Sequence, residues 1–415
     1  MARPSSTLFP LADNEIIDTL QTGYKWNFDD PSNKVMYYST SGSYFWNYEF
    51  LESNEFQTQL GVLFHNIGVF LDIEFRPLGY FRTTSTTEGY KEAYKAGSDI
   101  NFSAISSGFQ SGFFVDDGSV LAPFYSQSAL AYATFPSTES QITRGYEGAP
   151  GDVWLNYDSP TVQSLTYDPG DPGFLVLLHE VFHSLGLKHP HDDGGTGRPT
   201  FQDVGASEFD RQAITVMSYD LSHNGGDGVL QGSLPIAPTF SDLVNLQYLY
   251  GEAKINLGDN IHKIDSVGNY YNTIFDPAGN DTLDFSEFPD SVFCYMGDSL
   301  MNNGTNDYRF GSFYTIAGRI EIISTDDMVF PDFMIDLYGD FENGKGSRFK
   351  DHFQANDLNN RLEGGGGNDW LDGHTGLDTA IFTGNREEYS ITINRLGKTG
   401  DTGIEEGYLD NSISD

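Results

Sequence analysis

Three histidines and a glutamate share one short segment of the chain. The segment reads HEVFHSLGLKH and places His179, Glu180, His183 and His189 within eleven positions. Side chains at positions i and i+4 lie on one face of a helix, so His179 and His183 can share a metal ion. Neutral imidazole is a ligand that suits zinc. The spacing therefore predicts a site for one catalytic zinc ion.

The third ligand and the base follow from the same segment. Gly186 can take a positive φ, which lets the chain leave the helix sharply and return His189 to the metal. His191 is an alternative third ligand, but the spacing after the glycine favours His189. Three protein ligands leave one position for water, whose pKa zinc lowers towards ~7. Glu180 would accept the proton of this water and pass it to a leaving amine.

A helix must carry the first two histidines, and its start and end are visible. The apolar run at 174–178 follows Asp171 and Pro172. The aspartate is placed to cap free N–H groups, and proline is suited to the first turn. Gly186 is predicted to end this helix.

The rest of the chain separates into a mixed part and a strand-rich part. Apolar patterns predict strands at 35–38, 73–77, 100–102 and 129–135 and helices at 52–63 and 241–250. This mixture indicates an α+β domain. Beyond Gly251, short apolar runs separated by Gly, Asn and Asp predict an all-β domain. We therefore predict residues 1–30 as a leader, surface helix or short pro-segment, 31–251 as the catalytic domain, and 252–415 as the β domain.

Charge and cysteine content exclude several classes of partner. The formal net charge of -38 would repel nucleic acid and anionic membrane surfaces. The single Cys294 excludes an intrachain disulfide. No basic start followed by an apolar run appears after Met1, so no cleaved signal peptide is predicted, and no stretch is apolar enough for membrane insertion. Excess carboxylates are compatible either with bound calcium or simply with solubility.

The pattern HExxHxxGxxH resembles the zinc motif of the metzincin metallopeptidases. Downstream, the segment ITVMSY places Met217 where this family has its Met-turn, and Tyr219 two residues later is typical of the serralysin branch. The resemblance implies a catalytic domain with a twisted mixed sheet and an active-site helix. It also implies that Tyr219 is an additional zinc ligand in the free enzyme and stabilises the oxyanion once substrate binds.

A glycine-rich segment in the β domain matches the calcium-binding nonapeptide GGxGxDxUx of RTX proteins. In this pattern glycines expose carbonyl groups and an aspartate completes the site. The match predicts one or more structural calcium ions in a short parallel β-roll. The next nine residues repeat the spacing with His374 in place of a glycine, and GNDTLDF resembles the start of the serralysin C-terminal domain. The predicted calcium-binding residues are Gly364, Gly365, Gly367, Asp369, Gly373, Asp378 and Asp281.

The resemblance implies a monomeric extracellular endopeptidase that acts on protein or peptide substrates. It further implies export by a one-step (type I) machine without a cleaved signal peptide. The chain ends in Asn411-Ser412-Ile413-Ser414-Asp415 rather than in the apolar terminus usual for serralysins, which leaves the export route open. Two alternatives remain: a calcium-binding adhesion or scaffold protein with an inactive metal centre, and another metzincin branch joined to an unrelated β domain.

Overall fold

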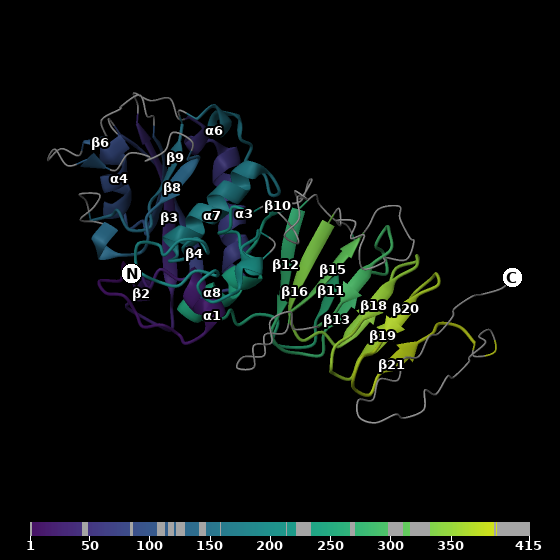
Figure 1. Ribbon diagram of the computed structural model, residues 1–415. Coiled ribbons are helices and arrows are strands. Elements are labelled where there is room, and N and C mark those ends of the chain that lie inside the picture. The colour runs from purple at the N-terminus through teal and green to yellow at the C-terminus, as the bar shows by residue number, and fades with distance from the viewer. Residues whose placement is uncertain are drawn as a thin grey trace. The chain divides into compact units, whose positions relative to one another are not determined.

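The chain divides into two compact units, which are described separately (Figure 1). The computed structural model describes residues 2–43, 49–83, 86–105, 113–114, 120–121, 129–140, 147–157, 159–212, 214–220, 234–265, 270–297, 310–315, 333–385 and 387. The first unit comprises Met1–Val229 and Leu234–Ala253, and the second comprises Leu230–Ser233 and Lys254–Asp415. No helix in these described ranges is long and apolar enough to cross a membrane.

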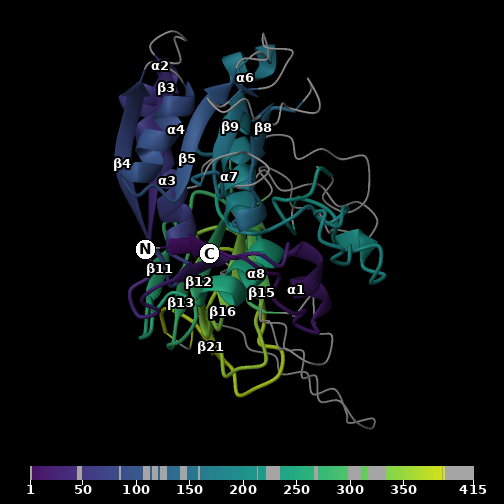
Figure 2. The ribbon, with the colours of Figure 1, turned by 90° about the vertical axis from the view of Figure 1, so that its left-hand side faces the viewer.

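The first unit is built on a mixed five-stranded sheet with the order β4-β3-β5-β9-β8 (Figure 2). Its strands are β3 (Val35–Ser43), β4 (Glu74–Thr83), β5 (Ile100–Ile105), β8 (Ala131–Ala133) and β9 (Val153–Asn156). Neighbouring strands are parallel except that β8 pairs antiparallel with β9. The fully buried side chains of Met36, Phe102 and Leu155 belong to its core. Strand β8 is therefore an edge strand of this sheet.

Helices pack against this sheet. Helix α4 contacts β3 and β4, α3 contacts β4 and α7, and α7 contacts β8 and β9. The helices of the unit are α1 (Glu15–Leu20), α2 (Glu49–Glu52), α3 (Asn54–Gly68), α4 (Thr86–Lys95), α6 (Pro160–Ser164), α7 (Pro172–Ser184) and α8 (Phe240–Tyr250), with a 3-10 turn η1 (Ser207–Phe209). Short strands β6 (Phe113–Phe114) and β7 (Val120–Leu121) pair antiparallel, and β10 (Leu234–Pro235) contacts α7.

The N-terminal segment forms part of the first unit. Strand β1 (Ala2–Pro4) pairs antiparallel with β2 (Trp26–Phe28). Between them, Asn14 caps α1, and its side chain accepts hydrogen bonds from the amides of Ile16 and Ile17. The side chain of Asn245 on α8 donates to the carbonyl of Ile16 at 3.0 Å. Helix α1 is thus fixed to α8.

The start of helix α7 differs in one detail from the prediction. Asp171 occupies the N-cap position and Pro172 the first turn, but the side chain of Asp171 makes no capping hydrogen bond. Burial of the apolar face explains why the helix forms without that bond, since Phe174, Leu177, Leu178 and the following Val181 are all fully buried.

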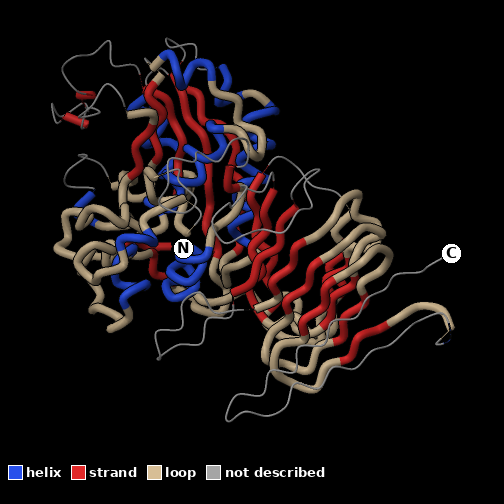
Figure 3. The backbone as a smooth tube through the Cα atoms, turned by 45° about the vertical axis from the view of Figure 1, so that its right-hand side comes forward, coloured by secondary structure: helices blue, strands red, loops and turns tan. Residues whose placement is uncertain are grey.

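The second unit contains two sheets of short strands joined by turns (Figure 3). One sheet is entirely parallel in the order β11-β13-β17-β19-β21. The other continues in the order β12-β16-β15-β14-β18-β20, parallel except where β15 pairs with β14 and β16. The strands are β11 (Ile261–Lys263), β12 (Tyr270–Asp276), β13 (Thr282–Asp284), β14 (Phe293–Tyr295), β15 (Phe310–Thr315), β16 (Phe333–Gly339), β17 (Asn343–Lys345), β18 (His352–Gln354), β19 (Arg361–Glu363), β20 (Trp370–Asp372) and β21 (Thr379–Ile381).

The last turns of the second unit repeat every eighteen residues. Asn343 pairs with Arg361, and Arg361 pairs with Thr379, so each step is 361 − 343 = 379 − 361 = 18 residues. His352 and Trp370 in the other sheet have the same offset. Buried Leu283, Phe353 and Leu362 belong to the apolar cluster of this unit. Each turn of chain thus contributes one strand to each sheet.

Candidate metal centre

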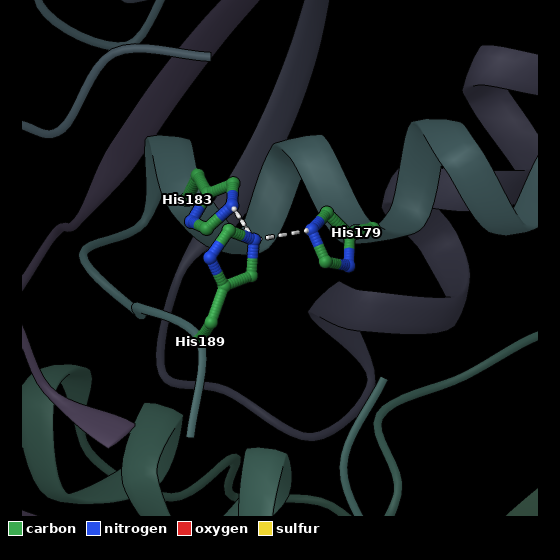
Figure 4. A group of neighbouring side chains, drawn as sticks. All are labelled: His179, His183 and His189. Atoms are coloured by element: carbon green, nitrogen blue, oxygen red, sulfur yellow. Dashed lines mark hydrogen bonds between the residues drawn. The ribbon is translucent and has the colours of Figure 1, made fainter. Parts of the chain in front are cut away.

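The three predicted histidines meet at the end of helix α7 (Figure 4). His179 and His183 project from successive turns of the helix, and Gly186 then reverses the chain with a φ of 103°. A Cβ atom at position 186 would lie 2.4 Å from the carbonyl oxygen of Tyr24, so both conformation and space require glycine. After this turn, His189 returns to the same place.

The distances between the ring nitrogens suit a shared metal ion. Nε2 of His189 lies 3.2 Å from Nε2 of His179 and 3.1 Å from Nε2 of His183. Four-coordinate zinc with Zn–N bonds of about 2.0–2.1 Å requires its nitrogens to be about 3.3 Å apart. The observed spacing is close to that value.

The opposite nitrogen of each ring has an oxygen acceptor. Nδ1 of His179 donates to the carbonyl of Val216 at 2.9 Å, and Nδ1 of His183 donates to the carbonyl of Leu187 at 2.8 Å. Nδ1 of His189 lies 2.6 Å from Oδ2 of Asp192. Because a carbonyl can only accept, these bonds leave the Nε2 lone pairs directed at the shared centre. Lone pairs at this separation repel one another unless a cation lies between them, so the donor set fits zinc.

Burial keeps the ligands neutral. Burial, followed by the neighbouring His189, lowers the pKa of His179 to about 3. The same causes, burial first, place the pKa of His183 well below its usual value. Metal ligation requires the unprotonated imidazole. The first two ligands are therefore ready to bind at neutral pH.

Glu180 is buried beside the histidines. Its side chain is 7% exposed, and its Oε2 atom has no hydrogen-bond partner among the described residues. Burial raises the pKa of Glu180 to about 8. Because burial disfavours the charged carboxylate, this side chain holds a proton more readily than an exposed glutamate does.

Tyr219 completes the cluster. Its hydroxyl oxygen lies 2.8 Å from Nε2 of His189, and its ring stacks on His179 with 5.7 Å between centroids. The ring is 65% exposed. Partial desolvation, with smaller contributions from Glu180 and Asp192, raises the pKa of Tyr219 to about 12. The phenol is therefore protonated at neutral pH.

Met217 lies in a tight turn fixed by an aspartate that the sequence analysis did not single out. Met217 is fully buried and follows Val216, whose carbonyl accepts the His179 bond. Asp242 on α8 accepts hydrogen bonds from the amide of Val216 at 2.8 Å and the hydroxyl of Thr215 at 2.6 Å. Asp192 was missed as well, although its position three residues after the third histidine is a usable signal.

His191 lies beside the cluster rather than within it. Its ring stacks on His189 with 5.1 Å between centroids, and its Nδ1 atom is 3.6 Å from Oδ2 of Asp210. His191 can be grouped with His189 and Asp192 as a second set of donors. In that set, however, Oδ2 of Asp192 already accepts the Nδ1 bond of His189.

The predicted calcium residues lie at the turns of the second unit. Gly365 and Gly367 have φ values of 88° and 112°, and His374, at the position where glycine was expected, also has a positive φ of 60°. Oδ1 of Asp369 accepts the amide of Asp351 at 2.9 Å, whereas its Oδ2 has no partner among the described residues.

Two more of the predicted aspartates, Asp378 one turn later and Asp281 near the start of the unit, have surroundings similar to those of Asp369. Oδ1 of Asp378 accepts the amide of Asn360 at 3.0 Å. Asp281 is fully buried, and its Oδ2 also has no partner in the described part of the chain. Gly364 and Gly373 leave room for the carboxylates, because a Cβ at either would lie within 2.5 Å of an oxygen of Asp369 or Asp378.

One member of the repeat, Asp351, was not predicted from the sequence. Asp351 lies eighteen residues before Asp369, since 369 − 351 = 18, and Gly346 precedes it as Gly364 precedes Asp369. Burial raises the pKa of Asp351 to about 7 and that of Asp369 to about 6. The signal that could have identified Asp351 is a glycine five residues before an aspartate. It was hidden because bulky residues stand where the nonapeptide pattern has its other glycines.

Comparison with known proteins gives several relatives, while no family model matches the chain. The chain is 30% identical over 187 residues to serralysin C of Dickeya chrysanthemi, covering 42% of this chain and 37% of that protein. It is 30% identical over 246 residues to serralysin of Proteus mirabilis, covering 56% and 44%. It is 31% identical over 155 residues to metalloprotease AprA of Pseudomonas entomophila (strain L48), covering 33% and 32%. The chain thus spans less than half the length of these relatives.

The mixed sheet, helix α7 and the three converging histidines are compatible with the metzincin class. Over the matched residues, the chain is similar to the serralysins and to metalloprotease AprA.

Proposed function

We propose that this chain is a secreted zinc-dependent endopeptidase that hydrolyses peptide bonds of extracellular proteins. The observation that carries the proposal is the convergence of three Nε2 atoms, each fixed through Nδ1, beside a buried glutamate. His179, His183 and His189 would hold one zinc ion. A bound zinc ion supplies Lewis acidity to a water molecule and to the substrate carbonyl.

Glu180 is proposed as the general base. Its Oε2 atom has no hydrogen-bond partner among the described residues, which leaves it available to take a proton from water. The same carboxyl would then give that proton to the leaving amine. A neighbouring cation favours the charged form of a carboxyl, which would bring the Glu180 pKa down from the value of about 8 that burial alone produces.

Tyr219 is proposed to have two roles. In the free protein its hydroxyl lies with the histidine nitrogens, 2.8 Å from Nε2 of His189, where it would act as an additional ligand. With substrate present, the protonated phenol would donate a hydrogen bond to the oxyanion. The exposure of its ring leaves it free to move between these two positions.

Substrate is proposed to bind as an added strand. Strand β8 is the last strand of its sheet and contacts helix α7. No described strand pairs with its outer edge, where an extended peptide could bind through main-chain hydrogen bonds, which do not depend on sequence. Protein or peptide substrates of varied sequence are therefore expected, with no role for nucleic acid or membrane insertion.

The second unit is proposed to be a calcium-binding parallel β-roll of the RTX type. The eighteen-residue repeat and the positive φ values at the glycines support this proposal, as do the carboxylate oxygens of Asp281 and Asp369 that have no partner among the described residues. Calcium between successive turns would neutralise buried carboxylates in a chain of net charge -38. We also propose that the protein is an extracellular monomer, exported through a one-step machine.

The proposed activity can be tested by casein hydrolysis with calcium held in excess. Addition of a zinc-selective chelator is expected to abolish hydrolysis, and added zinc is expected to restore it. A folded, zinc-loaded sample without activity would contradict the proposal and favour an inert calcium-binding protein.

A further inference from the structure

Lys188, the residue before the third histidine, is buried without a carboxylate partner among the described residues. Its side chain is 0% exposed. The Nζ atom donates to three carbonyl oxygens, those of Thr19 at 2.6 Å, Asp192 at 2.7 Å and His189 at 3.2 Å. An ammonium group has three N–H donors, so this carbonyl cage satisfies all of them.

One wall of the cage belongs to the N-terminal segment. Gln21 and Leu187 form an antiparallel bridge, the amide of Lys188 donates to the carbonyl of Leu20 at 2.7 Å, and the amide of Thr22 donates to the carbonyl of Gly186 at 2.9 Å. The chain leading into His189 is therefore paired with the chain leaving α1.

The other wall is the turn that orients the third histidine. Oδ2 of Asp192 lies 2.6 Å from Nδ1 of His189, and its Oδ1 accepts the amide of Gly194 at 2.8 Å. Gly194 has a φ of 61°, and a Cβ there would lie 3.0 Å from Cδ of Lys188. The lysine stem thus fills the inside of this turn while its ammonium group joins both ends, the carbonyls of His189 and Asp192.

We propose that Lys188 is a positioning residue for the zinc site. Its ammonium group ties the N-terminal segment to the 189–192 turn and thereby fixes Asp192, which in turn orients His189. This inference rests on the proposed zinc function. Burying a charge costs free energy that an apolar side chain of the same length would not. The contribution of Lys188 is therefore to the geometry of the third ligand.

The test compares variants of two buried cations in the full-length protein. Lys188→Met keeps the side-chain length and removes every donor, whereas Lys188→Gln keeps two N–H donors. Arg198→Met is the matched control: Arg198 is 6% exposed, its Nη2 donates to the carbonyl of Phe9, and no hydrogen bond between described residues joins it to the 189–192 turn. For each protein, zinc affinity is measured by competition with a chromophoric chelator. The absorption spectrum of the cobalt-substituted protein and the melting temperature of the metal-free protein are recorded as well.

The wild-type protein is expected to bind one zinc ion, and failure to do so would refute the proposed function itself. Lys188→Met is expected to bind zinc about 10-fold more weakly or worse, the range for lost outer-shell support, with a changed cobalt spectrum. Lys188→Gln should fall between Lys188→Met and the wild type, and it carries the comparison if Lys188→Met does not fold. Arg198→Met should lower the melting temperature and leave affinity and spectrum unchanged. Wild-type affinity and spectrum in both Lys188 variants, or equal losses in Arg198→Met, would overturn the inference.

Discussion

The ring of His179 and the peptide of Val216 are joined by a hydrogen bond of 2.9 Å. The first histidine of the metal centre is therefore oriented by the turn that contains Met217. That turn is held by Asp242, a fully buried residue of α8 that also accepts bonds from the amide and hydroxyl of Thr239. An element distant in sequence from the zinc motif thus fixes one of its ligands.

Replacement of Asp242 should affect both stability and metal binding. Asp242→Ala leaves the buried donors of Thr215, Val216 and Thr239 without an acceptor, so we expect a loss of about 2–4 kcal/mol of unfolding free energy. Zinc affinity should also fall, because the Val216 carbonyl is no longer held. Chemical denaturation and chelator competition measure the two effects. Thr239→Ala removes only one of the donors to Asp242, so it should cost about 1 kcal/mol and lower zinc affinity less than Asp242→Ala does.

Tyr219→Phe should separate catalysis from metal binding. The variant loses the hydroxyl that lies 2.8 Å from His189, and we expect kcat to fall by about 10²–10³-fold with one zinc still bound. Steady-state kinetics and metal analysis on the same sample measure both quantities. Tyr248→Phe, at a half-exposed position on α8, serves as the control and should be fully active. An unchanged kcat in Tyr219→Phe would rule out the oxyanion role.

The calcium-free protein should show a distinctive pH dependence in its second unit. Burial in the folded protein raises the pKa of Asp369 from the usual value of 3.8 to about 6. A raised folded-state pKa means that protonation stabilises the fold, so stability should fall as pH rises from about 4 to about 7, by roughly 2–3 kcal/mol for this group. Calcium binds the ionised carboxylate, so in excess calcium stability should instead rise with pH over this range.

Thermal unfolding with a calcium chelator and with excess calcium, at several pH values, tests this prediction. Asp369→Asn should make the fall in stability between pH 4 and 7 smaller, leaving the part that Asp351 contributes, and should reduce the stabilisation by calcium. Glu363→Gln on strand β19 also removes one negative charge. It should change neither the pH dependence of stability nor the stabilisation by calcium. A melting temperature insensitive to calcium at pH 7.5 would contradict the account of the second unit.

Gly364 should not tolerate a side chain. A Cβ atom at this position would lie 2.3 Å from Oδ2 of Asp369, so Gly364→Ala must displace the carboxylate. We expect the free energy of unfolding to fall by about 1–3 kcal/mol. The rise in melting temperature that calcium causes in the wild type should also be lost. Gly258→Ala is the matched control, because no atom lies within 4 Å of a Cβ there. Equal behaviour of the two variants would show that the turn is more open than described.

The residues of the metal centre could be located from the sequence because they follow one local rule. His179 and His183 lie one helical turn apart, and Gly186 has the positive φ that the return of His189 requires. The strands at Val35–Ser43 and Ile100–Ile105 also begin where the apolar pattern predicted them. These features depend only on neighbours in the chain.

Features that depend on distant contacts could not be predicted. Asp242 is twenty-six residues from the Val216 amide that it holds. Lys188 bonds a carbonyl 169 residues away, at Thr19. The N-terminal residues had three interpretations because their pairing partners, such as Leu187, are far along the chain. Asp351 was overlooked because its turn has Ser347 and Phe349 at the positions where the next turn has Gly365 and Gly367.

The proposed mechanism makes Glu180 the base beside a zinc ion held by three histidines. The most direct measurement is kcat/KM of Glu180→Gln on a fluorogenic peptide, with the zinc content of the same sample. The glutamine keeps the size of the side chain and cannot accept the proton. We predict one zinc per chain and a fall in kcat/KM on the order of 10³-fold or more. Wild-type turnover by the zinc-loaded variant would contradict the mechanism.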